Sequence, residues 1–493
     1  MFLSKSQYIR GLQCHKSLWL YKHKPELRTV PDDQQTSLFG EGIQVGDLAK
    51  QLFPGGVEIA YDGDDFQGMI DKTETLIRDG SEVLYEAAFS EQGIFVMVDI
   101  MVRNGSAWDV YEVKGSTSVK DVHINDAAIQ WHALSHRLDL NRASIVHIDN
   151  SYVREKDLDV AKLFKIEDIT ESIKEQQSQV MKSLEVMETM LDGPIPEIDI
   201  GAQCSDPYEC DFHAHCWQHI PYPSVFNLYW MNGGKKFTLY RDGILTYDDL
   251  PSDYRLNATQ ELQVTTAKTA TLYINHDIIE DFLSTVEYPI NFFDFETFQN
   301  AIPRFEGQRP YMQIPFQYSL HILHKDGTLE HKEFLGDEFS DPRRALIEQM
   351  LNDMTSTGSI VAYNQAFEKS RINELALFDT QYRDQLLELN QRFVDLIVPF
   401  RKRGYYHPDF NGSFSIKSVL PAMFPNDDEL DYKKLEIQNG GMAMDTFARL
   451  YLLNQAEQRE KIRNDLLAYC RLDTLAMVRI WQRLQEIVKE KDL

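Results

Sequence analysis

Alternating apolar and polar positions characterise the chain between residues 81 and 113. Residues 81–89, 93–102 and 108–113 follow this two-residue period and are separated by short turns, which predicts three β-strands. Apolar residues over 125–138 instead recur at helical spacing, and 170–191 has the pattern of an amphipathic helix. Strands followed by helices in this order predict a mixed α/β domain.

A second group of predicted elements lies toward the end of the chain. Residues 288–298 form an apolar, aromatic run that predicts a strand, and 360–368 predicts a short strand leading into a helix. Residues 465–480 have helical spacing. We therefore expect a second α/β domain over residues 286–493.

Residues 221–285 are predicted to form a helical connector between these domains. A helix, a turn at Gly243 and a second helix beginning at Thr246 would suit a helix-hairpin-helix-like module. Such modules present backbone N–H groups to phosphates. A plain helical connector is the alternative.

Composition and charge restrict the class of protein. The chain is 43% hydrophobic, but no apolar run approaches the roughly 20 residues of a membrane span, and its start lacks the apolar core of a secretory signal. We therefore expect a cytoplasmic protein with no membrane partner. The net charge of −27 argues against nonspecific coating of a polyanion, although a local basic groove stays compatible with it. The first 28 residues are locally basic, with Lys5, Arg10, Lys16, Lys22, Lys24 and Arg28.

Three of the five cysteines fall within 13 residues, at Cys204, Cys210 and Cys216, and a fourth is Cys14. Clustered cysteines in a reduced compartment indicate metal or redox chemistry rather than disulfides. Four thiolates suit a [4Fe–4S] cluster or a tetrahedral zinc ion. Zinc is the lesser alternative, with His213 and His215 as substitute ligands, and unliganded thiols are a third. A ligand near residue 14 joined to three near 210 sets the first domain at 1–220.

Asp99, Glu112 and Lys114 form a candidate metal-dependent site in the first domain. Residues two apart on a strand point to the same face, so Glu112 and Lys114 are expected to lie side by side. Two carboxylates can hold a hard divalent cation, and a lysine can activate the attacking water. Gln130, on the helix that follows, is expected to support the site. A solvated strand face is the alternative.

The second domain has its own acidic set. Asp294 and Glu296 interrupt the aromatic strand, and acids in such surroundings are costly to bury unless they bind a cation. Glu368 follows the short strand near Asn364. Tyr469 and Asp473 share one face of the last helix because they are four residues apart. Asp395 is a weaker accessory candidate, and solvated acids are the alternative.

The first set resembles the RecB-type PD-(D/E)XK nucleases that carry an iron–sulfur cluster. The residues that carry this resemblance are, in order, Cys14, Glu86, Asp99, Glu112, Lys114, Gln130, Cys204, Cys210 and Cys216. It covers about residues 1–220 and implies a restriction-endonuclease-like fold that cleaves DNA, preferentially single-stranded, with Mg²⁺ or Mn²⁺. Glu86 would join the metal site. Two departures are Leu134, where the family has tyrosine, and the absence of a histidine from 39–53.

The second set resembles the DEDD exonucleases, which have an RNase H-like fold. Asp294 and Glu296 match the first motif, Asn364 to Glu368 the second, and Tyr469 with Asp473 the third. The resemblance implies two metal ions, a tyrosine that orients water, and 3′→5′ cleavage. Glu368 stands where the family normally has aspartate. Both halves together resemble an uncharacterised bacterial family that fuses a RecB-like nuclease to a DEDD-like domain.

The expected function is that of a nuclease with two sites that acts on single-stranded DNA or DNA ends. The alternatives are a nucleic-acid-binding iron–sulfur scaffold with one or both sites silent, or an RNA-trimming exonuclease with the RecB-like half as a clamp. Candidate backbone-binding residues are Arg401, Lys402, Arg403 and Lys417. No Gly-rich ATP-binding loop is present, so any unwinding would need a helicase partner.

Overall fold

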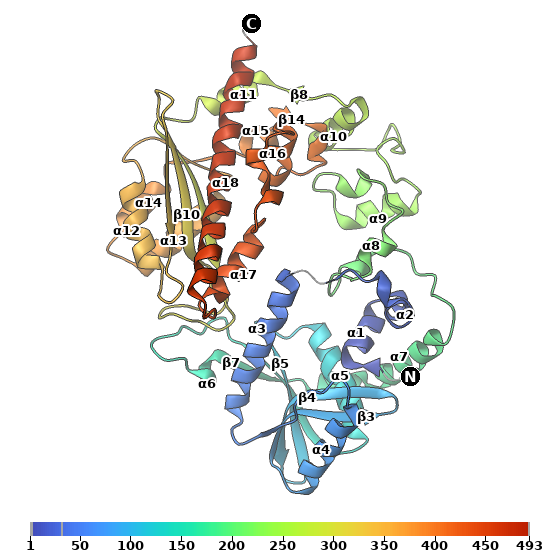
Figure 1. Cartoon of the computed structure of the whole chain (residues 1–493). Coiled ribbons are helices and arrows are strands. Elements are labelled where there is room, and N and C mark those ends of the chain that lie inside the picture. The colour runs from blue at the N-terminus through green and yellow to red at the C-terminus, as the bar shows by residue number, and fades with distance from the viewer. Residues whose placement is uncertain (1–2, 31–32, 492–493) are drawn as a thin grey trace. The chain divides into compact units, whose positions relative to one another are not determined.

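The structure is a computed structural model that describes residues 3–30 and 33–491, with side chains from residue 40 onward in the second range (Figure 1). The chain divides into two compact units. Unit 1 comprises residues 1–219 and 300–311, and unit 2 comprises 220–299 and 312–493. The excursion of 300–311 into unit 1 is held by Arg154, whose Nη1 donates to the carbonyl oxygen of Pro303 at 2.9 Å.

Unit 1 is built on a seven-stranded mixed sheet. Its strands are β1 (Leu3–Ser4), β2 (Val57–Glu58), β3 (Val83–Glu91), β4 (Ile94–Asn104), β5 (Ala107–Lys114), β6 (Leu140–Ile148) and β7 (Phe164–Asp168). The order is β2-β3-β4-β5-β6-β7, and β1 pairs with β4 in parallel. Strands β3, β4 and β5 are antiparallel, whereas β6 runs parallel to β5. The three predicted strands and the helix after them are therefore confirmed.

Helices cover both faces of this sheet. They are α1 (Lys5–Gln13), α2 (His15–His23), α3 (Asp33–Ala49), α4 (Phe66–Arg78), α5 (Asp121–Ser135), α6 (Val160–Leu163), α7 (Thr170–Leu191) and α8 (His213–Cys216). One core joins the sheet to α4, α5 and α7, with Trp108 and Ile173 among its buried members. A second core, which contains Val45 of α3 and Ile100 of β4, forms on the other side. The amphipathic pattern of 170–191 is thus explained by burial of one face of α7.

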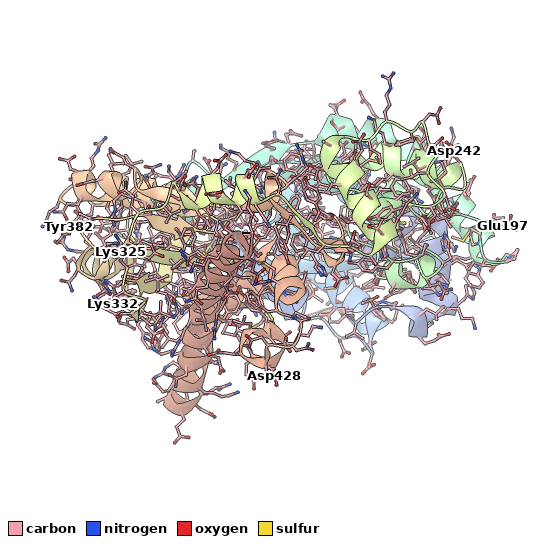
Figure 2. All side chains as sticks on the ribbon, turned by 90° about the horizontal axis from the view of Figure 1, so that it is seen from above. Glu197, Asp242, Lys325, Lys332, Tyr382 and Asp428 are labelled. Carbon is pink, nitrogen blue, oxygen red and sulfur yellow. The ribbon has the colours of Figure 1, made fainter. Side chains whose placement is uncertain are left out.

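Unit 2 contains a five-stranded sheet with helices on both sides. Its strands are β9 (Ile290–Phe298), β10 (Ile314–Leu323), β11 (Leu329–Leu335), β12 (Ile360–Ala362) and β13 (Phe393–Asp395), in the order β11-β10-β9-β12-β13. Strand β9 is antiparallel to β10 and parallel to β12. The hairpin between β10 and β11 carries exposed Lys325 at its turn (Figure 2).

The helices of unit 2 form two layers. They are α9 (Gly233–Arg241), α10 (Ala258–Thr269), α11 (His276–Leu283), α12 (Arg343–Asp353), α13 (Ala366–Phe378), α14 (Arg383–Leu389), α15 (Val398–Arg401), α16 (Ile416–Met423), α17 (Gly440–Leu450) and α18 (Ala456–Glu490). Helices α12, α13 and α14 lie on one side of β10 and the long α18 on the other (Figure 1). Two cores correspond to these layers, one around Phe293 of β9 and one around Phe292 and Trp481. Adjacent residues of β9 therefore point into opposite cores. A two-stranded sheet of β8 (Tyr273–Ile274) and β14 (Tyr405–Tyr406) completes the unit.

The helix predicted to begin at Thr246 is absent from the described residues. Helix α9 ends before exposed Asp242 (Figure 2), and the next helix begins at Ala258. The carboxylate of Asp249 accepts hydrogen bonds from the backbone N–H and the hydroxyl of Thr246 at 2.7 and 2.8 Å. Asp249 thus accepts hydrogen bonds from Thr246, and the chain forms a local turn here instead of a helix.

At the level of class, the α/β prediction is confirmed, since both units have mixed sheets flanked by helices. No helix in the described parts of the chain is both long enough and apolar enough to cross a bilayer.

Gly358, in the turn before β12, has φ +84°, and a Cβ there would collide with the carbonyl oxygen of Pro289. Gly327 has φ +92° with open space around it. We expect Gly327→Ala to lower the free energy of unfolding by about 1 kcal/mol through backbone strain alone. Gly358→Ala should cost about 3 kcal/mol or more, because the collision adds to the strain. Urea unfolding of both variants measures the difference, and equal losses would contradict this account of the turn.

Candidate active sites and cysteine centre

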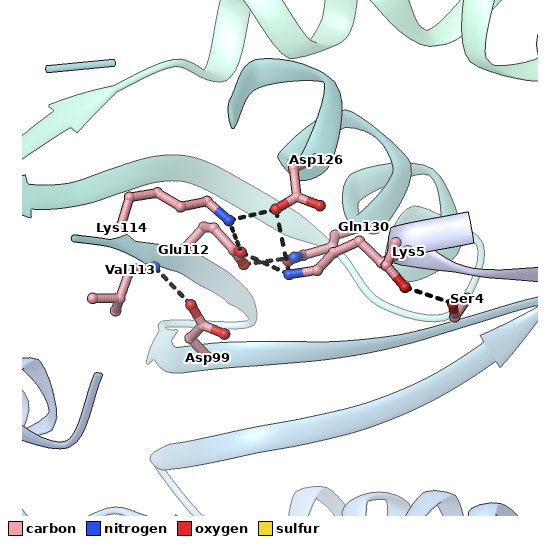
Figure 3. A network of polar contacts seen from close by, with 9 residues as sticks. Ser4, Lys5, Asp99, Glu112, Val113, Lys114, Asp126 and Gln130 are labelled. Atoms are coloured by element: carbon pink, nitrogen blue, oxygen red, sulfur yellow. Dashed lines mark hydrogen bonds and ion pairs between the residues drawn. The ribbon is translucent and has the colours of Figure 1, made fainter. Parts of the chain in front are cut away.

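The acidic site of unit 1 is assembled from two strands and two helices (Figure 3). Strand β4 supplies Asp99, and strand β5 supplies Glu112 and Lys114 on one face, as predicted. Lys114 Nζ lies 2.7 Å from Glu112 Oε1. Gln130 of α5 donates from Nε2 to Glu112 Oε2 at 2.6 Å. The fold therefore brings together Glu112, Lys114 and Gln130, which were predicted from the sequence to share one site.

Two members of this site were not predicted, Lys5 and Asp126. Lys5, the first residue of α1, places its Nζ 2.6 Å from Glu112 Oε1 and 3.5 Å from Asp126 Oδ2. Lys114 Nζ lies 2.5 Å from the same oxygen of Asp126. Asp126 precedes Gln130 by four residues, so helical spacing could have found it. Nothing in the local sequence of Lys5 connects it to a residue 107 positions away.

Charge neutralisation dominates the electrostatics of Glu112, which is only 3% exposed. Burial alone would raise the pKa of Glu112, but the ammonium groups of Lys114 and Lys5 outweigh it and hold the pKa well below its ordinary value. For Lys5 and Lys114, burial alone would lower the pKa, but the carboxylates of Glu112 and Asp126 outweigh it and raise the pKa of both lysines. Glu112 is thus an ionised carboxylate held between two cations.

Asp99 and Glu86 occupy less neutralised positions. Asp99 is half-buried and accepts a hydrogen bond from the backbone N–H of Val113 at 2.7 Å. Burial, with the nearby charge of Glu112, raises the pKa of Asp99 to about 7. Glu86 lies opposite in β3 with φ 55°, and its Oε1 is 3.8 Å from Lys50 Nζ. Burial also raises the pKa of Glu86. Both carboxylates are therefore neutralised less completely than Glu112.

In unit 2, four predicted acids from three elements converge. Strand β9 presents Asp294 and Glu296 on one face, α13 presents Glu368, and α18 presents Asp473 together with Tyr469. Carboxylate oxygens of Asp294 and Glu296 and the sulfur of Cys470 lie within 4.8 Å of one another. Glu296, Glu368 and Asp473 are buried, and Asp294 is half-buried.

This acidic cluster lacks the neutralisation seen in unit 1. Burial, followed by the charge of Asp473, raises the pKa of both Asp294 and Glu296 well above its ordinary value. Burial raises the pKa of Glu368 to about 8 and that of Asp473 to about 6. Glu368 Oε2 is buried without a hydrogen-bond partner. Carboxylate oxygens are the ligands that Mg²⁺ and Mn²⁺ prefer, so the donor set fits hard divalent cations.

Aromatic residues and one lysine border the cluster. Tyr432 donates its hydroxyl to Asp473 Oδ1 at 2.5 Å, a contact that sequence analysis did not predict. Lys417 Nζ lies 5.4 Å from the ring centre of Tyr432 and 5.5 Å from that of Tyr469. The charge of Lys417 lowers the pKa values of Glu296 and Asp473, although burial outweighs it. Lys417 is therefore part of the surroundings of the acidic site.

Asp395, the weaker accessory candidate, binds the backbone at the start of α13. Its Oδ1 accepts from the backbone N–H of Asn364 at 2.8 Å, and its Oδ2 accepts from that of Gln365 at 3.3 Å. Asn364 has φ 70°, so the turn before α13 is strained and needs such support. Asp395 thereby fixes the start of the helix that presents Glu368.

The basic triplet 401–403 lies at the end of α15. Arg401 and Lys402 are exposed, whereas Arg403 is half-buried, with Nη1 3.5 Å from Thr259 Oγ1. The charge of Arg401 acts on Tyr363, where it opposes the rise in pKa that burial causes. Of the four predicted backbone-binding residues, Lys417 is the one with contacts at the acidic cluster.

The four predicted cysteines line one pocket in unit 1, together with His213. Cys14 separates α1 from α2, and the other three follow α7. Arg10 forms a bidentate ion pair with Asp211, at 2.5 and 3.0 Å, and Arg28 Nε donates to the same carboxylate at 2.8 Å. The two ends of unit 1 are thus joined by protein contacts beside the thiols.

The spacing of the thiols bears on the ion that they would hold. A tetrahedral zinc ion with Zn–S bonds of about 2.3 Å places its sulfur atoms about 3.8 Å apart. Among the described residues, no three of the four sulfur atoms lie within 4.8 Å of one another. A four-iron cluster separates its thiolates further, because the irons lie between them. The four thiols thus line one pocket without a group of three sulfur atoms as close as a zinc ion would hold them.

Comparison with known proteins identifies relatives without an assigned activity. Residues 291–415 match a family model described as a domain of unknown function, DUF2779. The uncharacterized protein MG366 of Mycoplasma genitalium is 29% identical over 221 residues, which is 41% of this chain and 33% of that protein. The uncharacterized protein UU173 of Ureaplasma parvum is 28% identical over 221 residues, 40% of this chain and 31% of that protein. The chain thus spans about a third of the length of these curated relatives.

The raised pKa values in unit 2 predict a pH dependence of stability. Between pH 5 and 8 the folded protein retains a proton on Glu368 that the unfolded chain, with an ordinary pKa of 4.5, has lost. Without divalent cations, Glu368 should therefore make the free energy of unfolding fall as pH rises, by about 1 kcal/mol per pH unit, in addition to the contributions of Asp294, Glu296 and Asp473. Glu368→Gln should reduce the slope by the contribution of Glu368, and Glu388→Gln, at an exposed site, should leave the slope unchanged. Thermal unfolding at several pH values measures it; a rise in stability over this range would contradict the assignment.

Proposed function

We propose that the chain is a metal-dependent nuclease that degrades nucleic acid, with single-stranded DNA or DNA ends as the substrate. One observation carries this proposal: Asp294, Glu296, Glu368 and Asp473 converge in a buried space without enough positive charge to neutralise them. Divalent cations would supply that charge, and they are what phosphodiester cleavage requires.

The architecture of unit 2 supports an RNase H-like DEDD exonuclease. Its central strand β9 carries the first two acids, and the order β11-β10-β9-β12-β13 combines antiparallel and parallel neighbours as that fold requires. Asp294, Glu296, Glu368 and Asp473 would hold two metal ions, which stabilise the attacking and leaving oxygens. The 3′→5′ direction rests on the resemblance.

Tyr469 and Lys417 would act beside these ligands. Burial, followed by the charge of Asp473, raises the pKa of Tyr469, so its hydroxyl keeps its proton and can donate a hydrogen bond to water or phosphate. Lys417 is exposed, at the border of the cluster. Its ammonium group is suited to a backbone phosphate, as are the guanidinium groups of Arg401 and Arg403.

Unit 1 supports a second nuclease site of the PD-(D/E)XK type. The succession α4-β3-β4-β5-α5-β6, with three antiparallel strands and a parallel fourth, agrees with that fold. Glu86, Asp99 and Glu112 would hold the metal, Lys114 would orient the water, and Gln130 would support Glu112. The cysteine pocket would hold a [4Fe–4S] cluster.

One observation favours a second candidate, in which unit 1 is a silent nucleic-acid clamp. Both oxygens of Glu112 already have hydrogen-bond partners, Lys5 and Lys114 on Oε1 and Gln130 on Oε2. A carboxylate in this state has less capacity for a metal ion than those of unit 2. Cleavage by each site has to be measured separately.

The cofactor is tested by metal analysis of the chain purified without oxygen. We expect iron and inorganic sulfide in equal amounts, and little zinc, because four cysteines that line one pocket suit a [4Fe–4S] cluster. Cys210→Ser should strongly reduce the iron content. Cys470→Ser is the matched control, since Cys470 belongs to unit 2. Stoichiometric zinc without iron would overturn the cluster assignment.

The activity is tested on single-stranded DNA labelled at either end, with Mg²⁺ or Mn²⁺. Asp294→Asn should reduce one product series and Glu112→Gln another, each at least about hundredfold, because even outer-shell partners of a metal ligand are worth 10–100-fold. Asp253→Asn and Glu175→Gln are exposed controls for the same chemical changes. If Glu112→Gln has no effect, unit 1 is the clamp. If wild type leaves DNA intact but shortens RNA, the substrate class is RNA.

A further inference from the structure

Lys5 is in direct contact with the most buried carboxylate of unit 1. Its Nζ lies 2.6 Å from Glu112 Oε1, while Lys114 Nζ lies 2.7 Å from the same oxygen (Figure 3). A carboxylate oxygen has two lone pairs, and here both have a charged donor. A divalent cation can therefore bind this oxygen only after one ammonium group has moved away.

The backbone at Lys5 is fixed by the elements on each side of it. The backbone N–H of Leu3 donates to the carbonyl oxygen of Gly93 at 2.8 Å, which attaches β1 to the start of β4. Ser4 caps α1 by a reciprocal pair of hydrogen bonds with Gln7, at 3.2 and 3.3 Å. Arg10 holds the helix to Asp211 further along. The fold thus delivers the side chain of Lys5 to Glu112.

Of the two lysines, Lys5 is the less firmly held. Lys114 extends from a central strand and has a second ion pair with Asp126 at 2.5 Å. The corresponding distance from Lys5 to Asp126 is 3.5 Å. The side chains of Lys5 and Lys114 are almost equally exposed, at 23% and 22%, so the ion-pair distances to Asp126 are what distinguish the two lysines. A cation that approaches Glu112 would displace Lys5 before Lys114.

We propose that Lys5 competes with the divalent cation for Glu112 in the unit 1 site. Lys5 thereby sets the concentration of divalent cation that this site requires. This inference rests on the proposed metal-dependent function of unit 1. With Glu86, Asp99, Glu112 and Asp126, the site has four carboxylates against two ammonium groups. Replacing one ammonium group with a divalent cation changes the net formal charge from −2 to −1, so the exchange reduces the excess negative charge.

The test measures Mn²⁺ binding to the full chain by electron paramagnetic resonance, with Asp294→Asn and Glu296→Gln present throughout to suppress the unit 2 site. Lys5→Met is compared with Lys24→Met, which makes the same change at an exposed position of the basic N-terminal stretch. We expect Lys5→Met to lower the Mn²⁺ Kd at least about tenfold, since close charge pairs contribute on that scale. Lys24→Met should leave the Kd unchanged.

Further variants separate the possible failures. Adding Glu112→Gln to Lys5→Met should abolish the tighter binding, and Lys5→Arg, which keeps the charge, should bind Mn²⁺ no more tightly than the parent. Lys5→Gln replaces Lys5→Met if that variant does not fold. Unchanged or weaker binding in the neutral variants, with binding still dependent on Glu112, would overturn the competition but not the metal site. Mn²⁺ binding that is absent, or insensitive to Glu112→Gln, would overturn the proposed function of unit 1 as well.

Discussion

A carboxylate that is removed from water has to be neutralised by a cation or by a proton, and both candidate sites are organised around this requirement. In unit 1 the protein supplies its own cations, because Lys5 and Lys114 contact Glu112 and keep it ionised. In unit 2 burial and mutual repulsion raise the pKa values of Asp294 and Glu296, and at Glu296 the charge of Lys417 offsets only part of this effect. The first site is stable as an ion-pair network. The second is left with protons that an incoming cation can replace.

Helix α1 connects the unit 1 site to the cysteine pocket. It has nine residues, so its ends are about 13 Å apart, with Lys5 first and Cys14 directly after the last. Its charged side chains are used internally: Lys5 pairs with Glu112, and Arg10 pairs with Asp211 beside Cys210. Part of the locally basic N-terminal stretch is thus already paired with acids within unit 1. Any ligand that draws the four thiols together acts on the helix that positions Lys5.

Local patterns allowed much of this arrangement to be predicted, and long-range pairing accounts for most of the rest. The two-residue period of β5 placed Glu112 and Lys114 on one face, and four-residue spacing placed Tyr469 beside Asp473. Lys5 could not be found this way, because its partner lies more than a hundred residues away and tertiary contacts, among them the pairing of β1 with β4 and the packing of α1 on α5, bring them together. Tyr432 could not be predicted from local patterns either, because it contacts Asp473 from a separate segment of the chain. The helix expected at Thr246 does not form, because the side chain of Asp249 accepts the hydrogen bond from the backbone N–H of Thr246.

The family match covers only part of unit 2. The matched segment, 291–415, includes Asp294, Glu296 and Glu368 but ends before α18, which carries Tyr469 and Asp473. Helix α18 also contributes Trp481 to the core that contains Phe292 of β9. The same helix therefore completes the acidic cluster and buries one face of the strand beneath it. Since Asp473 is the largest charged contributor to the raised pKa of both Asp294 and Glu296, the excess negative charge of the acidic cluster is a property of the whole unit and not of the matched segment.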